Sequence, residues 1–181
     1  MRGAAFLFAA AGLALSACDA ATTSAAASGE VSRADADFPE RTGRVVDSAA
    51  LLSSAQEAKL SQQIERLEAR TSDQLVIVTV PSLENRSIED YSLALANDWG
   101  VGQAGKDNGV LILVAPNDRR IRIEVGSGLE SVLSNARAKQ IIDSDLMPFF
   151  REARWFEGLE AGTGAIATTL ADRAAVRRGK S

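Results

Sequence analysis

Two nearly unbroken apolar runs constrain the fold of this chain more than any other feature. Residues 75–80 read Leu-Val-Ile-Val-Thr-Val, and residues 110–115 read Val-Leu-Ile-Leu-Val-Ala. An apolar run without polar alternation is typical of a strand that is covered on both faces of its sheet. Helices must then lie on both sides of that sheet. The two runs therefore predict an α/β domain built in layers.

Helical patterns surround these runs. Ser54-Ala55-Gln56-Glu57 fits a capping box, in which we expect the Ser54 hydroxyl to accept a hydrogen bond from the Glu57 amide. A third strand is predicted where apolar and charged residues alternate. The predicted elements are helices over about 54–70, 87–99, 135–146 and 157–172, and strands over 75–80, 110–115 and 120–125. Their order predicts a small mixed sheet with helices on both faces.

The beginning of the chain resembles a bacterial lipoprotein signal. Residues 4–15 are apolar except for Gly12, are too short to span a bilayer, and lead into Ser16-Ala17-Cys18. In such a signal the peptide is removed and Cys18 becomes the acylated first residue. An ordinary secretory signal with an incidental cysteine is the alternative. In both cases we expect residues 1–17 to be absent from the mature protein, which then lies outside the cytoplasm.

Composition divides the mature chain into three segments. Residues 18–41 are rich in Ala, Ser, Thr and Gly with scattered charge, which predicts a flexible tether. Residues 42–172 carry the globular pattern and are long enough for one domain with a sizeable core. Residues 173–181 form a basic C-terminal tail. We interpret this tail as solvated, with contact to anionic lipid as the alternative.

The residue inventory excludes several kinds of chemistry. The chain has no histidine and a single cysteine. Ser-His and Cys-His nucleophilic pairs, imidazole acid–base catalysis and the usual zinc sites are therefore excluded. The net charge of −4 also argues against a nucleic-acid binder. Carboxylates, hydroxyls, Lys, Arg and backbone groups remain, and these suit hard cations held by oxygen ligands.

Residues 100–106 match two nucleotide-binding motifs only superficially. They read Gly-Val-Gly-Gln-Ala-Gly-Lys, which fits GxGxxG and also the phosphate loop as far as its lysine. Both motifs must follow a strand and open a helix, whereas this segment follows a predicted helix and enters a predicted strand. Asp107 also stands where the phosphate loop needs Ser or Thr. We therefore expect no nucleotide site, and a surface loop shaped by its glycines.

Acidic and amide side chains flank the predicted strands. Asp107 and Asn108 precede the second predicted strand, where a plain turn competes with a set of cation ligands. Glu124 lies on the third strand and shares a face with Arg122, which could simply pair with it. Glu130 follows a glycine-rich turn.

Asp47 precedes the first predicted helix as a turn or cap residue. Its part in any cation site depends on whether the fold brings it near Asp107.

Several ordered motifs resemble the TPM domain family. The most characteristic is residues 122–130, Arg-Ile-Glu-Val-Gly-Ser-Gly-Leu-Glu, where the family often has an aromatic residue in place of Ser127. The other matching segments are Gly43-Arg44-Val45-Val46-Asp47 with Leu51-Leu52-Ser53, Trp99-Gly100-Val101-Gly102 leading into Lys106-Asp107-Asn108-Gly109-Val110-Leu111, Pro148-Phe149-Phe150, and Gly158-Leu159. The resemblance covers about Thr42 to Leu170, essentially the whole predicted domain.

The resemblance implies a three-layer α/β/α sandwich displayed outside the cytoplasm on a membrane anchor. Some members bind calcium or another divalent cation and have modest acid phosphatase activity, while others assist photosystem repair or modulate a receptor. The positions that match the acidic cluster of the family are Asp47, Asp107, Asn108 and Glu124, with Glu130 as a weaker candidate. We expect lipid on Cys18 to replace the C-terminal membrane helix that many relatives carry.

Two functions of different classes follow as hypotheses. The first is a lipid-anchored module in the cell envelope, facing the periplasm or the cell exterior. It would assist a membrane complex through a protein partner and bind a divalent cation. The alternative is a metal-dependent acid phosphatase, in which carboxylates hold a cation that polarises a phosphomonoester and activates water. A structural spacer is a third possibility. The cation hypothesis requires Asp107 to converge with Asp47 or Glu124.

Overall fold

The structure is a computed structural model in which residues 38–178 are described, with side chains described through Arg173. The predicted signal peptide 1–17, the lipidation site Cys18 and most of the predicted tether 18–41 lie outside the described residues. Within them, no helix combines the length and apolar character that crossing a bilayer requires.

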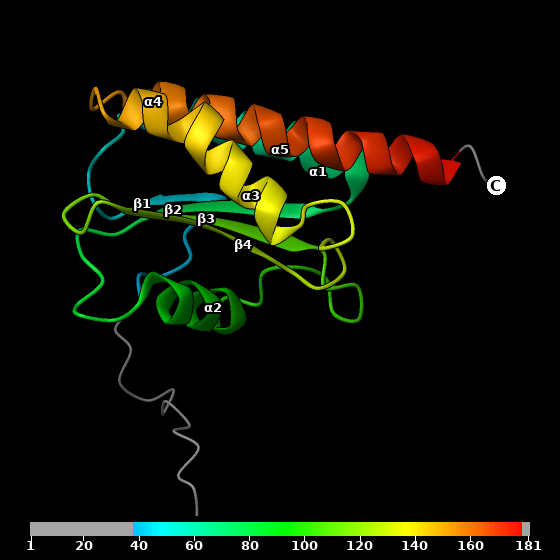
Figure 1. Cartoon of the computed structure of the whole chain (residues 1–181), viewed down its shortest axis with the longest axis horizontal. Coiled ribbons are helices and arrows are strands. Elements are labelled where there is room, and N and C mark those ends of the chain that lie inside the picture. The colour runs from blue at the N-terminus through cyan, green and yellow to red at the C-terminus, as the bar shows by residue number, and fades with distance from the viewer. Residues whose placement is uncertain (1–37, 179–181) are drawn as a thin grey trace, which may run out of the picture. The chain divides into compact units, whose positions relative to one another are not determined.

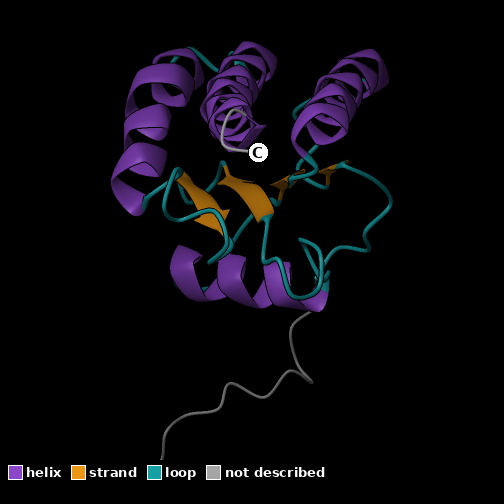
Figure 2. Cartoon of the chain, turned by 90° about the vertical axis from the view of Figure 1, so that its right-hand side faces the viewer, coloured by secondary structure: helices purple, strands orange, loops and turns teal. Residues whose placement is uncertain are grey.

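A four-stranded sheet between two layers of helices forms the domain (Figures 1 and 2). The strands are β1 (Val45–Asp47), β2 (Gln74–Thr79), β3 (Gly109–Ala115) and β4 (Arg120–Val125). The helices are α1 (Ser54–Thr71), α2 (Ile88–Asp98), α3 (Asn135–Ile141), the π-helical segment η2 (Ile142–Leu146), α4 (Met147–Phe150) and α5 (Trp155–Arg178). The sheet order is β1-β2-β3-β4, with β1, β2 and β3 parallel and β4 antiparallel to β3. The predicted three-layer α/β/α sandwich with a mixed sheet is confirmed.

The apolar runs form the two central strands, as predicted. Every residue of β3 is buried, and its side chains alternate between two hydrophobic cores. Leu111 and Leu113 pack toward α2, whereas Ile112 and Val114 pack toward the layer that contains α1 and α5. The absence of polar alternation in the sequence thus reflects helices on both faces of the sheet.

Two local predictions differ from the structure. The edge strand β1 was not expected, because three residues are too few to show a strand period. The predicted helix 135–146 changes to π-helix at Ile142 and runs directly into α4. Pro148 lies near the start of α4, and a proline ring excludes the regular bond to the carbonyl four residues earlier.

The domain also extends beyond both predicted boundaries. Phe38 packs edge-on against Tyr91 with ring centroids 5.1 Å apart, and the Pro39 carbonyl accepts from the Trp99 indole at 3.0 Å. Phe38 and Pro39, which the prediction assigned to the tether, therefore pack against the domain. At the other end, α5 continues to Arg178, so Arg173 belongs to a helix and not to a solvated tail.

The capping box of α1 lies one residue earlier than predicted. Ser53 is the N-cap, and its hydroxyl accepts from the Gln56 amide at 3.4 Å. In return the Gln56 side-chain oxygen accepts from the Ser53 amide at 2.8 Å. The predicted cap, Ser54, is the first helical residue.

This shift gives a direct test of the cap. Ser53→Ala should lower the free energy of unfolding by about 1 kcal/mol, because the first turn loses a side-chain acceptor. Ser54→Ala is the matched control and should change it by less than about 0.5 kcal/mol. Urea denaturation followed by circular dichroism measures both. A larger loss for Ser54→Ala than for Ser53→Ala would contradict the assignment.

Candidate functional site

The five predicted cation ligands do not meet at one place. Asp47 pairs with Thr79 where β1 and β2 end, whereas Asp107 precedes β3, whose first residue pairs with Gln74 at the start of β2. Because these strands are parallel, the two aspartates lie at opposite ends of the sheet. The length of β2 alone separates them by about 16 Å. Asp47 and Asp107 therefore cannot share one cation.

Asp47 holds the connection between β1 and α1. One carboxylate oxygen accepts from the Leu52 amide at 2.7 Å, and the other accepts from the Thr79 hydroxyl. The Thr79 hydroxyl also accepts from the Ala49 amide at 3.0 Å. These contacts are those of a turn residue, the role that the sequence offered as the alternative.

Glu124 is engaged on the α2 face of the sheet. Its side chain is 16% exposed and accepts from Arg122 Nε at 2.7 Å and from the Ser92 hydroxyl of α2 at 2.9 Å. Arg122 also lies 3.9 Å from Glu89 of α2. The pairing with Arg122, which the sequence offered as the alternative to a cation site, is therefore present. Through the contacts with Ser92 and Glu89, this pair joins β4 to α2.

The remaining candidates lie on what we call the loop edge, residues 100–108 and 126–134. Asp107 is exposed, and its Oδ2 accepts from the Ser127 hydroxyl at 3.2 Å. Glu130 is exposed in the second of these loops. The Gly128 amide donates to the Asp107 carbonyl at 3.1 Å, so the two loops are joined through their backbones. This edge presents oxygen-bearing side chains to solvent.

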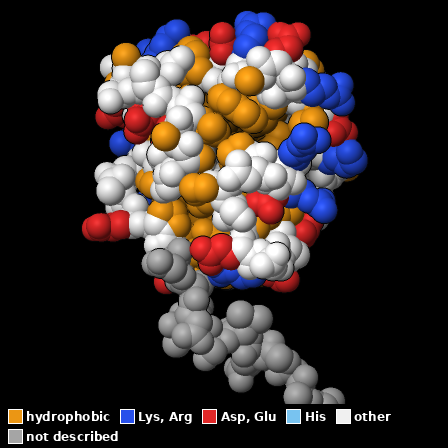
Figure 3. Space-filling view, turned by 90° about the vertical axis from the view of Figure 1, so that its left-hand side faces the viewer, with side chains coloured by type: hydrophobic (Ala, Val, Ile, Leu, Met, Phe, Trp, Pro, Cys, Tyr) orange, Lys and Arg blue, Asp and Glu red, His pale blue; other side chains and the backbone are white. Residues whose placement is uncertain are grey.

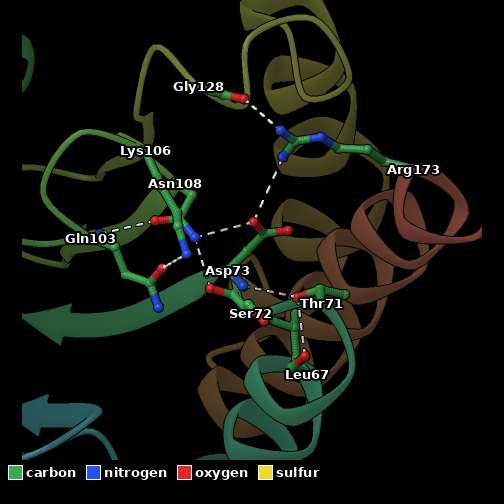
Figure 4. A network of polar contacts seen from close by, with 9 residues as sticks. All are labelled: Leu67, Thr71, Ser72, Asp73, Gln103, Lys106, Asn108, Gly128 and Arg173. Atoms are coloured by element: carbon green, nitrogen blue, oxygen red, sulfur yellow. Dashed lines mark hydrogen bonds and ion pairs between the residues drawn. The ribbon is translucent and has the colours of Figure 1, made fainter. Parts of the chain in front are cut away.

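Asn108 is directed inward beneath the loop edge (Figure 4). It is 4% exposed, and its Nδ2 donates to the Ser72 carbonyl at 2.7 Å and to Asp73 Oδ1 at 3.4 Å. Its Oδ1 accepts from the Gln103 amide at 2.9 Å. Asn108 thus ties the loop before β3 to the end of α1, which is a structural role and not that of an exposed ligand.

Asp73 and Arg173 complete this network, and the sequence indicated neither of them. Arg173 Nη1 lies 3.6 Å from Asp73 Oδ1, and the two side chains are 11% and 8% exposed. Arg173 Nη2 donates to the Gly128 carbonyl at 2.9 Å. A residue from α5 therefore fixes both the end of α1 and the second loop of the edge (Figure 4).

The chemistry available at the loop edge is that of a few hard oxygen donors. The Asp107 carboxylate and the Ser127 hydroxyl are adjacent and exposed. Within the described residues, no group of three or more acidic side chains gathers around a common point. The arrangement can accept a cation or a donor group of a partner through Asp107.

The fold and this edge define a class of protein. It is a three-layer α/β/α domain with three parallel strands, one antiparallel edge strand, and a polar loop edge whose backbone is held by Asn108 and Arg173. Residues 45–169 match the TPM domain family, and the chain belongs to that family. The predicted resemblance is therefore confirmed. No curated protein matches the chain significantly.

Solved structures from three bacteria share the fold. The N-terminal domain of a protein from P. gingivalis is 34% identical with a TM-score of 0.68, and the match covers 74% of this chain and 85% of that one. The N-terminal domain of the cg2496 protein from Corynebacterium glutamicum is 16% identical with a TM-score of 0.58, covering 74% and 84%. The BA42 protein of the psychrophile Bizionia argentinensis is 21% identical with a TM-score of 0.60, covering 67% and 82%. The last two show the fold alone.

Proposed function

We propose that this protein is a binding module of the cell envelope, tethered to a membrane through lipid on Cys18, that assists a membrane complex by engaging a protein partner. One observation carries the proposal: buried side chains hold the backbone of the loop edge, while polar side chains on the same edge are exposed to solvent. Arg173 and Asn108 hold its backbone, while Asp107 and Ser127 stay exposed. Binding residues are commonly placed on loops that a rigid scaffold positions.

A divalent cation, with calcium as the first candidate, is part of this proposal. The full predicted set does not fit one ion, because Asp47 lies at the other end of the sheet, Glu124 is paired, and Asn108 is directed inward. Asp107 and Glu130 are the remaining carboxylates of the set, and Asp107 is the one with the Ser127 hydroxyl beside it, so it would anchor the ion with water completing the coordination. So few protein ligands favour a dissociation constant of about 10⁻⁴–10⁻³ M.

The positions of the carboxylates do not favour a metal-dependent phosphatase as a second function. That mechanism needs carboxylates converging on one ion next to the phosphoryl group. Asp47, Asp107 and Glu124 instead belong to separate contacts at separate places. We derive no catalytic step through them.

Calcium titration of the full chain tests the cation part. Asp107→Ala should weaken calcium affinity by about tenfold or more, because the anchoring carboxylate is lost. The control is Asp98→Ala at the end of α2, an exposed aspartate on a different element, which should leave the affinity unchanged. Calorimetry measures both. Equal affinity in the wild type and Asp107→Ala, or no heat up to about 10 mM calcium, would contradict a site at this edge.

Crosslinking in intact envelopes tests the partner. The full chain should give a discrete crosslinked complex that a chelator or Asp107→Ala depletes and Asp98→Ala does not. Cys18→Ser should move the chain out of the membrane fraction. A complex that survives Asp107→Ala together with Glu130→Ala would place the partner elsewhere on the domain.

A further inference from the structure

A second candidate site lies at the opposite end of the sheet from the loop edge. A cavity of about 450 Å³ opens between the turn that joins β3 to β4 and the segment from α4 to the start of α5. Its apolar wall includes Ile121, Met147, Phe150 and Trp155. Two arginines, Arg119 and Arg151, also line it. Arg120 borders it too, but its side chain shares the α2 face of β4 with Arg122 and Glu124 and lines a separate cavity that includes Asp118 and Glu89. We call it the arginine-rimmed pocket. On this side of the molecule, Figure 3 shows apolar side chains gathered in a hollow with basic side chains along one flank.

The positive charge of this pocket is not neutralised by the described side chains. Within the described residues, no carboxylate pairs with the guanidinium group of Arg119 or of Arg151. The acidic residues nearby in sequence are engaged elsewhere. Glu152 and Glu157 each lie 3.5 Å from Arg154. The Asp118 carboxylate accepts from the Leu83 amide at 2.9 Å, on the α2 side of the turn.

Arg119 occupies its position at a conformational cost. Its φ is 53°, in the left-handed region where a residue with a side chain is strained and glycine is not. The turn from Pro116 to Arg119 is otherwise regular, with the Arg119 amide donating to the Pro116 carbonyl at 3.1 Å. The hairpin turn itself accounts for this φ, because a type I turn is commonly followed by a residue in the left-handed region, and six other described non-glycine residues also have positive φ.

Two features of the fold add to the suitability of the pocket for an anion. Trp155 in its wall is the first residue of α5, so the positive amino end of that long helix lies at the pocket. Val114 and Ala115, which end the parallel strand β3, also line the cavity. In open α/β sheets, ligands bind outside the carboxyl ends of the parallel strands.

We propose that the arginine-rimmed pocket binds a small amphiphilic anion, with one carboxylate or phosphate head on an apolar body. The forked guanidinium groups would hold the head through charge-assisted hydrogen bonds. The apolar body would fill the wall formed by Phe150, Trp155, Met147 and Ile121. The cavity is of the size that small organic ligands use, and its mixture of apolar wall and few charged groups is typical of such sites. The proposal does not depend on the loop edge.

Tryptophan fluorescence of the full chain can test this directly. The chain has two tryptophans, so Trp99→Phe leaves Trp155 as the single emitter. In that variant with Cys18→Ser, which removes the chain's own predicted lipid, laurate and dodecyl phosphate should give saturable changes in emission. Dodecanol, which lacks the charge, should bind about tenfold or more weakly. Inorganic phosphate alone should give no change.

Arginine variants then test whether the guanidinium groups bind the charged head of the ligand. Replacing Arg119 and Arg151 together by Gln should raise the dissociation constant for laurate by about tenfold or more. Arg66→Gln, on the exposed surface of α1, is the control and should not change it. Calorimetry with the Cys18→Ser chain, both tryptophans retained, repeats the measurement in case Trp99→Phe does not fold. Equal affinity for laurate and dodecanol, or undiminished affinity in the double arginine variant, would overturn the proposal.

Arg119→Gly separates a binding role from a structural one. Glycine relieves the left-handed strain, so the midpoint of thermal unfolding should not fall, while the affinity for laurate should decrease. A variant that loses stability and keeps its affinity would show that Arg119 serves the turn and not the ligand.

Discussion

Gly128→Ala should lower the free energy of unfolding by about 3 kcal/mol or more, the upper end of what overpacking costs. A Cβ atom at this position would lie 1.9 Å from the Lys106 carbonyl oxygen and 3.1 Å from that of Asp107. Both oxygens belong to the backbone, so no side-chain rotation relieves the contact. The two loops of the edge would have to separate, which breaks the bond from the Gly128 amide to the Asp107 carbonyl.

The matched control is Gly43→Ala. A Cβ atom there meets only the Val45 carbonyl oxygen at 3.9 Å, an ordinary contact. Its expected effect is within about 0.5 kcal/mol. Urea denaturation followed by circular dichroism compares the two variants. A loss below about 1 kcal/mol for Gly128→Ala would mean that the loops of the edge part easily, and would remove the rigidity on which the proposed function rests.

The layers of this fold were predictable because their signal is repeated along the chain. Buried strands of six or seven residues leave long apolar runs, and a helix such as α2 carries both a cap, Ser87, and an apolar face. The strand β1 carries only three residues and no such repetition. Because β1 was missing from the predicted elements, the positions of the site residues relative to one another could not be predicted either.

The disposition of Asp47 and Asp107 follows from β1. Asp47 ends its strand, while Asp107 precedes the strand β3. Residues that end one parallel strand and precede another lie at opposite ends of the sheet. Without β1, nothing in the sequence distinguished this arrangement from one in which the two aspartates meet. The sequence therefore left open a grouping of Asp47 with Asp107 that the fold excludes.

The partners of the candidate residues could not be predicted by any local pattern. Thr79 and Ser92 occupy ordinary positions on a strand and a helix, yet their hydroxyls contact Asp47 and Glu124. Arg173 stands among other basic residues near the end of the chain, which favoured a solvated tail. Its partner Asp73 lies in a different part of the sequence. Such pairings arise only when α1, α5 and the loop edge pack together.

The contribution of this pairing can be measured by removing its cation. Arg173→Met should lower the free energy of unfolding by about 3 kcal/mol or more, because it leaves the Asp73 carboxylate buried without its counter-charge and the Gly128 carbonyl without its donor. Adding Asp73→Asn to that variant should recover part of the loss, since the buried charge is then gone. Chemical denaturation of both single variants and the double variant gives the coupling energy.

Arg44→Met is the matched comparison, because it shows whether burial or a short distance determines how much an ion pair contributes to stability. Arg44 and Glu68 lie closer together, at 2.8 Å, but their side chains are 40% and 32% exposed. Exposed pairs contribute about 1 kcal/mol or less, so this variant should be only slightly destabilised. If Arg44→Met costs as much as Arg173→Met, desolvation is not what makes the Asp73–Arg173 contact strong.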